Sequence, residues 1–440
     1  MIEKSKFFYY SFCIFFWVLA TWAFVIQEIP GLGVLEGPIR FLIDFAVISV
    51  GLMALNNKRD ALIMVSFVLL SFTSTIFING ESLLTYLNGF REYIGLIFMA
   101  PIVRYILTCH RRDEFVAGFD RQIVIFLALQ LIVVPFQAIK YGVGDHGGGT
   151  LGDGLSGTLS TVIYMATFYL VSRRWDPTDY LGSLYKARYY FILLIPTFLN
   201  ETKISFIYLL IFFLLLFALK WTSVLKVVVA MPFVTMLLGV LAYFYLSVTH
   251  MDYDMFIEPE FYQAYLFGDD GDRLIEFSEN YENGDYYELE DQWAVDLPRF
   301  FKLAHLPEML EKTKGGMWFG AGNGQLKGGT MLDKTEFARK NEIWFRGTIP
   351  LLFDLLVQMG ILGVIWFVIN ILTALKLKNN RAPMGLNNKV LMLSFIFLQL
   401  FYGTLFTYLI VDLFLYYITF RSTNLVEEDD PAPASVRIVS

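Results

Sequence analysis

The chain of 440 residues has few histidines and almost no cysteine. Its two cysteines, Cys13 and Cys109, are too few for a disulfide framework, and its four histidines are too scattered for a zinc motif. The sequence also lacks a Walker A loop, an H-E-x-x-H pair and a G-x-S-x-G elbow. Its acidic run GDDGDRLIEF does not have the EF-hand spacing. We therefore expect neither a metal ion nor a cofactor.

Charge is scarce as well, and apolar residues take its place in long blocks. Only 17% of the residues are charged and 56% are hydrophobic, with a mean hydropathy of +0.55. Blocks of roughly twenty apolar residues are long enough to cross a bilayer. The sequence predicts an all-α, polytopic integral membrane bundle of about twelve transmembrane helices. The predicted spans are 7–26, 41–56, 61–79, 90–108, 120–139, 158–172, 188–200, 204–219, 226–248, 349–375, 389–405 and 406–420.

The order of apolar and polar blocks predicts four regions. Residues 1–249 hold the first nine helices, 250–346 form one large extracytoplasmic loop, 347–421 hold the last three helices, and 422–440 form a disordered tail. The first block is too long for a cleaved signal peptide, so we expect it to remain as a span. Alternate connections are rich in lysine and arginine, which places both termini in the cytoplasm.

Two polar segments stand out on the predicted outer face. One is the glycine-rich loop 142–157. The other is the large loop, in which residues 252–291 hold fourteen acids and one base, whereas residues 299–346 hold nine bases and five acids. The basic half contains GGMWFGAGNGQLKGGT at 315–330. Its glycines permit main-chain N–H groups to approach an oxyanion, and the alternative is a tight turn that re-enters the membrane.

These segments carry a family resemblance. The run WFGAGNG, the following span with Leu355–Gly363, the large outer loop before that span and the glycine-rich loop 142–157 together resemble the O-antigen polymerase/ligase superfamily. Ligases of that superfamily carry a His-Asn pair where this sequence has Ile349-Pro350. The resemblance therefore favours a Wzy-type polysaccharide polymerase over a ligase.

The resemblance implies a metal-independent membrane glycosyltransferase of the bacterial inner membrane. It would polymerise undecaprenyl-diphosphate-linked oligosaccharide repeat units on the periplasmic face into O-antigen, capsule or exopolysaccharide. Implied partners are this lipid-linked glycan, membrane lipid, a chain-length regulator and a flippase, but no nucleic acid. Two alternatives stay open: an O-antigen ligase that transfers glycan to a lipid acceptor, and a polytopic transporter or flippase without catalysis.

The chemistry of such a reaction points to basic side chains at the outer membrane surface. The diphosphate leaving group gathers negative charge, which arginine stabilises well because its planar fork binds phosphate oxygens in pairs. Candidate catalytic arginines are Arg91, Arg339 and Arg346, and Glu336 and Glu342 are candidate general bases alongside His305 and Asp333. Candidate substrate-binding residues are Lys203, Lys327, Lys340, Gly320, Gly322, Asn323 and Gly324. Each charged candidate could equally be a solvated surface group.

Asp44, Asp354 and Asp412 fall inside predicted spans, where charge is costly and often functional. Asp44 lies one helical turn from Arg40, so we expect an i,i+4 ion pair. Asp354 lies near the outer end of its span and is expected to face the active cavity. Asp412 has no explanation in the sequence.

Overall fold

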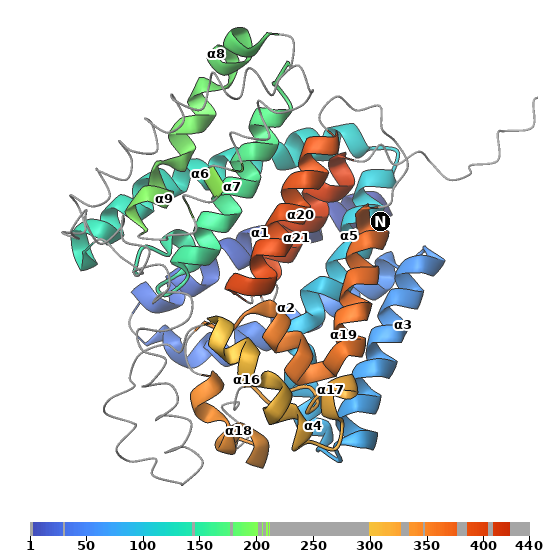
Figure 1. Cartoon of the computed structure of the whole chain (residues 1–440). Helices are drawn as coiled ribbons and strands as arrows, with labels where there is room; N and C mark the ends of the chain where they lie inside the picture. The colour runs from blue at the N-terminus through green and yellow to red at the C-terminus, as the bar shows by residue number, and fades with distance from the viewer. Residues whose placement is uncertain are drawn as a thin grey trace, which may run out of the picture.

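The computed structural model describes residues 3–29, 31–142, 146–176, 179–200, 205, 208, 209, 211, 299–326, 334–345, 348–375, 385–403 and 408–422. This part of the chain is helical and contains no strand (Figure 1), so the predicted all-α class is confirmed. The longer helices are α1 (Lys4–Glu28), α2 (Glu36–Ala54), α3 (Lys58–Phe72), α4 (Leu83–Phe90), α5 (Ile94–Thr108), α6 (Arg112–Tyr141), α7 (Ser156–Ser172), α8 (Tyr180–Phe191), α16 (Arg299–Glu311), α19 (Leu351–Leu375), α20 (Gly385–Tyr402) and α21 (Leu409–Ser422).

Short helical turns connect these elements. They are η1 (Leu32–Leu35), η3 (Arg91–Tyr93), η4 (Gly149–Leu151), η5 (Ile192–Leu194), α9 (Ile195–Leu199), α17 (Gly316–Phe319), α18 (Glu336–Lys340) and η6 (Glu342–Phe345), together with the π-helical turn η2 (Thr73–Ile78) that extends α3. In Figure 1, α4, α17 and α18 gather at the lower end of the bundle.

Five segments are long and apolar enough to cross a membrane: Lys4–Glu28, Leu32–Ala54, Lys58–Ile78, Arg112–Tyr141 and Leu351–Ala374. They correspond to five of the predicted spans and indicate a membrane protein. The helices α5, α7 and α21 pack with them but have only 15, 17 and 14 residues. The predicted span 226–248, residues 250–298 of the predicted loop and residues 423–440 of the predicted tail lie outside the described residues.

The helices α5 and α21 run side by side in the same direction at the centre of the bundle. Tyr416 of α21 donates a hydrogen bond to the carbonyl of Leu96 of α5 over 2.6 Å. Nearer the C-terminal ends of both helices, the Arg104 guanidinium lies 4.6 Å from the ring centre of Phe420. A Cβ added to Gly95 would lie 2.1 Å from a carboxylate oxygen of Asp412. This close approach explains the glycine and places the carboxylate of Asp412 in the core.

An aromatic stripe on α1 fills the space beside this pair. Phe8, Phe12 and Phe16 recur every four residues and are buried, as expected for one face of a helix. The ring centres of Phe12 and Phe16 lie 4.6 and 5.1 Å from that of Phe119 on α6. The ring centre of Tyr417 on α21 lies 6.3 Å from that of Phe12 and 4.7 Å from that of Phe119, so these rings join α1 and α6 to α21.

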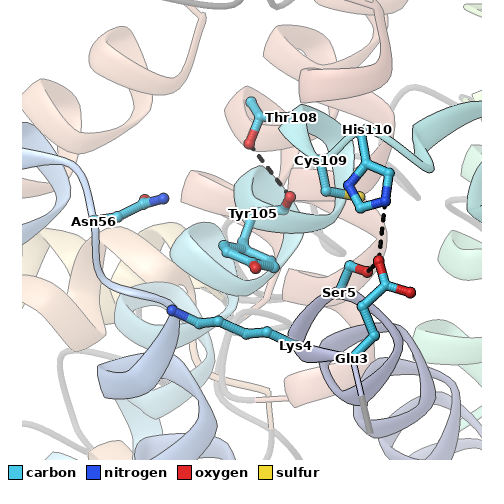
Figure 2. Close-up of a pocket in the computed structure, with 8 residues that line it drawn as sticks. All are labelled: Glu3, Lys4, Ser5, Asn56, Tyr105, Thr108, Cys109 and His110. Carbon is cyan, nitrogen blue, oxygen red and sulfur yellow. Dashed lines mark hydrogen bonds and ion pairs between the residues drawn. The ribbon is translucent and has the colours of Figure 1, made fainter. Parts of the chain in front are cut away.

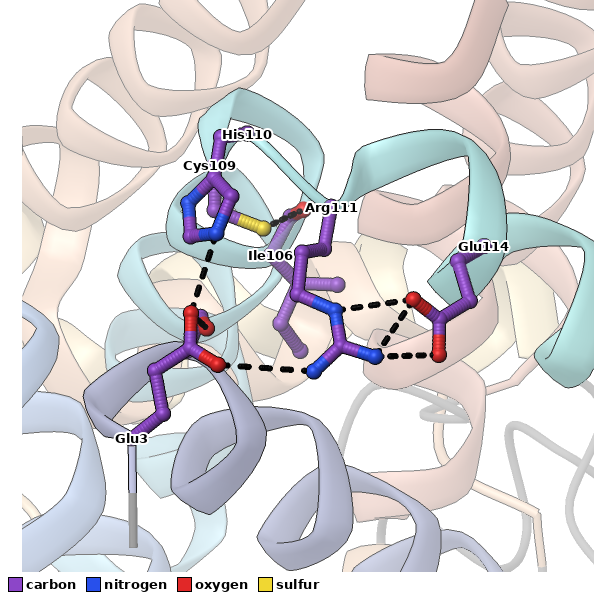
Figure 3. Close-up of polar contacts among 7 residues, drawn as sticks. Glu3, Ile106, Cys109, His110, Arg111 and Glu114 are labelled. Carbon is purple, nitrogen blue, oxygen red and sulfur yellow. Dashed lines mark hydrogen bonds and ion pairs between the residues drawn. The ribbon is translucent and has the colours of Figure 1, made fainter.

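The bundle has two polar ends, which lie at opposite ends of α5. We call them the Arg91 end and the Arg112 end; the 15 residues of α5 between them span roughly 22 Å. At the Arg112 end, Figure 3 shows the carboxylate of Glu3 between His110 and Arg111, at 2.9 and 3.4 Å. The hydroxyl of Ser5 and these two basic groups hold the pKa of Glu3 below its ordinary value. The contacts fix the start of α1 to the turn before α6.

A pocket of about 320 Å³ opens beside these residues (Figure 2). Its lining includes Lys4, Asn56, Tyr105 and His110. The Lys4 ammonium lies 5.5 Å from the ring centre of Tyr105. Lys4 and Arg111, which belong to the lysine- and arginine-rich segments predicted to face the cytoplasm, thus both lie at the Arg112 end.

Candidate functional site

The glycine-rich turn at 320–324 lies inside the bundle at the Arg91 end. The N–H of Asn323 donates to the hydroxyl of Thr75 over 2.8 Å, and the N–H of Gly324 donates to the side chain of Gln358 over 3.1 Å. The N–H of Ala321 donates over 2.7 Å to the carbonyl of Val357. Main-chain hydrogen bonds therefore anchor this turn to η2 and to α19.

A break in α19 makes one of these bonds possible. Gly360 has a φ of +65° inside the helix, a conformation that glycine adopts without steric cost. The break frees the carbonyl of Val357, which would otherwise accept from the next turn, for the N–H of Ala321. Gly320, Gly322 and Gly324 also have positive φ, and a Cβ on Gly89 of α4 would lie 2.1 Å from the nitrogen of Gly324. A side chain on either Gly89 or Gly324 would therefore collide with the main chain on the other side of the contact between α4 and the turn.

These contacts bear on the predicted oxyanion cradle. The N–H groups of Ala321, Asn323 and Gly324 are already donated within the protein, so this arrangement corresponds to the tight-turn alternative. Asn323 differs from its neighbours, because neither end of its buried side-chain amide has a hydrogen-bond partner among the described residues. Buried amides are ordinarily bonded, so this side chain is the part of the turn that is suited to a polar ligand or a water molecule.

Replacing Gly360 with alanine is expected to destabilise the fold by roughly 2–5 kcal/mol, because positive φ and overpacking add. A Cβ there would lie 2.3 Å from the carbonyl oxygen of Trp318. Gly37→Ala is the matched control, since a Cβ at Gly37 would meet nothing within 4 Å. Thermal unfolding in detergent measures both variants. Equal melting temperatures would show that the turn does not depend on the break in α19.

Two acids lie beside this turn and are held by the same glutamine. Gln358 donates over 2.6 Å to Asp354 and over 2.9 Å to Glu92, while Tyr93 donates to Asp354 over 3.0 Å. Asp354 is buried and Glu92 is partly exposed. We call Glu92, Tyr93, Asp354 and Gln358 the carboxylate cluster. It connects η3 to the first turns of α19 and, through Gln358, to the glycine turn.

Arg91 precedes this cluster and is held by Asp44. The Nε of Arg91 lies 2.7 Å from a carboxylate oxygen of Asp44, with the two side chains 36% and 10% exposed. The expected partner of Asp44 was Arg40; the structure gives Arg91 instead, because α2 packs along α5 and brings Asp44 beside η3. The Nη2 of Arg91 is buried and has no hydrogen-bond partner in the described part of the chain. One edge of the guanidinium is thus fixed and the other retains donor capacity.

The other predicted basic and acidic candidates lie elsewhere. Arg339 and Lys340 are exposed on α18. Glu336 pairs with Lys340 over 2.7 Å and is 77% exposed, and Lys340 holds the pKa of Glu336 below its ordinary value. Glu342 pairs with Lys334 over 2.7 Å. Lowering the pKa of a carboxylate weakens it as a base. The predicted residues Lys203, Lys327 and Arg346 lie outside the described residues.

Sequence reasoning did not select Glu92 and Gln358. Both carried a signal: Glu92 directly follows the candidate Arg91, and Gln358 is a polar residue inside the apolar run Leu355–Gly363. Across the part of the chain that the structure describes, no three His, Cys, Asp or Glu side chains are placed to hold a metal ion.

Comparison with models of known protein families and with curated protein sequences gives no match. The functional assignment therefore depends on the residues of the site.

Proposed function

We propose that this protein is a Wzy-type polymerase that joins lipid-diphosphate-linked oligosaccharide repeat units. The observation that carries the proposal is the position of Arg91. Its Nε is fixed by Asp44, its Nη2 has no partner among the residues that the structure describes, and the carboxylate Glu92 follows it directly. In the proposed reaction, the Arg91 cation stabilises the negative charge of the diphosphate leaving group, and the Glu92 carboxylate accepts the proton of the attacking hydroxyl.

The reaction assigns one role to each group. The acceptor hydroxyl oxygen forms a bond to the anomeric carbon of the donor, and the bond from that carbon to the diphosphate oxygen breaks. Glu92 takes the hydroxyl proton, and Arg91 stabilises the negative charge that gathers on the diphosphate. Glu92 suits the base role better than Asp354 because it is partly exposed, whereas Asp354 is buried and accepts two hydrogen bonds.

The arrangement of charge supports an orientation for this chemistry. The Arg112 end holds Arg59, Arg111, Arg173 and Arg174, and the positive-inside rule places such residues in the cytoplasm. The Arg91 end then faces the periplasm of a bacterial inner membrane. We propose that both termini are cytoplasmic, that the complete chain has about twelve spans, and that residues 250–346 form a periplasmic loop.

The break in α19 bears on the transporter alternative. Transporters place broken helices around an ion or substrate site at the membrane centre. Here the break at Gly360 is filled by the glycine turn, and the carbonyl of Val357 accepts from Ala321. The break therefore serves packing, which favours the enzyme over the transporter.

Reconstitution tests the proposal. The purified protein in lipid vesicles, supplied with undecaprenyl-diphosphate-linked repeat units, is expected to produce a ladder of longer lipid-linked chains on a gel. In cells, deletion of the gene is expected to leave single repeat units on the lipid anchor. Long lipid-linked chains that accumulate after deletion would instead indicate a ligase, and transport of intact repeat units without new glycosidic bonds would indicate a flippase.

A further inference from the structure

Arginines from three helices lie together at the Arg112 end. Arg112 is the first residue of α6, Arg173 follows the last residue of α7, and Arg421 lies in the last turn of α21. Asp120 is bonded to Arg173 and also accepts a hydrogen bond from Tyr417, which lies one turn before Arg421, and Arg421 lies close enough to Arg112 and Arg173 for their charges to interact. We call these three residues the arginine cluster.

One buried acid faces the cluster, and its hydrogen-bonding capacity is largely used. The carboxylate of Asp120 is bonded to Arg173. It also accepts hydrogen bonds from the hydroxyls of Tyr169 and Tyr417, each over 2.9 Å. Asp120 therefore neutralises Arg173 and offers little to the other two arginines.

The remaining two arginines have buried donors for which the described residues offer no partner. The Nε of Arg112 and the Nε of Arg421 are buried and make no hydrogen bond to any described residue. The acid whose charge favours Arg112 is Asp113, the next residue along the chain, which is exposed. Arg112 also stands at the N-terminus of a 30-residue helix, where the helix dipole favours an anion and disfavours a cation. Within the part of the chain that the structure describes, the buried donors of the cluster thus outnumber the acceptor oxygens that face them.

We propose that the arginine cluster binds the phosphate of an anionic phospholipid headgroup. A phosphate group accepts hydrogen bonds from several guanidinium groups at once. The cluster lies at one end of α6, which is long and apolar enough to cross the membrane, and basic sites between membrane helices on the cytoplasmic side suit such headgroups. The length of α5 separates this site from Arg91, so it is distinct from the proposed catalytic site.

The positive-inside rule alone does not account for the cluster. That rule requires arginines in cytoplasmic connections, where they would be solvated, as the exposed Arg174 beside the cluster is. It does not require the Nε groups of Arg112 and Arg421 to be buried. Burial of a charged donor without a partner is costly, and a bound phosphate removes that cost.

The test uses the full-length protein in phosphatidylcholine nanodiscs, with and without added phosphatidylglycerol. Phosphatidylglycerol is expected to raise the melting temperature of the wild-type protein and to be retained in native mass spectra. Arg112→Gln and Arg421→Gln are each expected to weaken retention about tenfold or more, since a hydrogen bond to a charged group is lost. Arg174→Gln is the matched control and is expected to retain the lipid as the wild type does.

Two further outcomes decide the proposal. Inorganic phosphate added to phosphatidylcholine nanodiscs is expected to raise the melting temperature less than phosphatidylglycerol does; an equal rise, lost in Arg112→Gln, would show a site for free phosphate and overturn the lipid assignment. Equal retention by all variants would show that the arginines take no part. Because neither measurement involves a glycan, its result is independent of the polymerase proposal.

Discussion

The Asp44→Asn/Arg91→Gln double variant is expected to fold and to lose about a hundred- to a thousandfold of its polymerising activity. Both charges of the pair are removed together, so Asp44, which is 10% exposed, is not left without a counter-charge. The lost interaction is the one that grows as charge gathers on the leaving diphosphate. The loss should therefore appear in kcat more than in KM.

Three single variants separate catalysis from folding. Asp44→Asn keeps the Arg91 guanidinium and is expected to retain most of the activity. Arg91→Lys keeps the charge but loses the planar fork, so its activity should lie between those of the wild type and the double variant. Arg59→Gln removes an exposed arginine at the other end of the bundle and serves as the control.

The rate of chain growth in vesicles is the measurement, with the melting temperature of each variant taken in parallel. Full activity in a folded double variant would remove Arg91 from the mechanism. In that case the diphosphate would need a different cation, and the exposed Arg339 would be the next candidate to test.

The long apolar helices were predictable from the sequence. The blocks that contain α1, α2, α3, α6 and α19 belong to segments that are long and apolar enough to cross a membrane, and this length and composition are visible in the sequence. The ends were less predictable: α6 begins at Arg112, eight residues before the predicted start at 120. The added turns are packed against the bundle, because Phe115, Val116 and Phe119 within them are buried.

The pairing of Asp44 was not predictable from local sequence. A helical turn offers Arg40 as a partner, and nothing near Asp44 points to a residue 47 positions further along the chain. The pair with Arg91 exists because α2 lies against α5, where a Cβ on Gly51 would lie 2.8 Å from the Cβ of Phe98. This contact depends on how the facing surfaces of α2 and α5 fit together. The sequence of one chain indicates which residues form each surface, but not which two surfaces pack against each other.

The glycine turn illustrates a second limit. Its glycines predicted either main-chain N–H groups that approach an oxyanion or a tight turn, and in the structure the N–H groups of Ala321, Asn323 and Gly324 are bonded within the protein. The acceptors of its N–H groups, Thr75 and Gln358, belong to helices far away in the sequence. The spacing of the glycines indicates that the main chain can adopt positive φ and approach another group closely, but it does not identify that group. A ligand-binding loop and a turn anchored within the protein therefore have the same sequence pattern.

Replacing Arg104 with methionine is expected to cost about 3–5 kcal/mol of stability, because it leaves the carboxylate of Asp60 buried and unpaired. Arg104 donates to both oxygens of Asp60, over 2.9 and 3.2 Å, and the two side chains are 11% and 5% exposed. The Phe420 ring faces the same guanidinium. Both side chains are buried in the protein, so water does not readily replace these contacts and the free carboxylate bears most of the penalty.

Thiol labelling can follow the unfolding of this variant. Cys13 is buried and Cys109 is half-buried, and both are free. In a Cys109→Ser background, a thiol-reactive dye therefore reports the exposure of Cys13 on heating in detergent. The expected result is a markedly lower melting temperature for Arg104→Met and an unchanged one for the exposed control Arg59→Met.

The double variant Asp60→Leu/Arg104→Met tests how much the ion pair itself contributes to the stability of the fold. If the cost of the single change arises from an uncompensated charge, removing both charges should restore most of the stability, because paired buried charges are about balanced by apolar side chains of similar size. Asp60 also lies in the first turn of α3, where a carboxylate favours the helix dipole by about 0.3–1 kcal/mol, so a small deficit should remain. A double variant as unstable as Arg104→Met would contradict this account and would show that the pair itself holds α3 against α5.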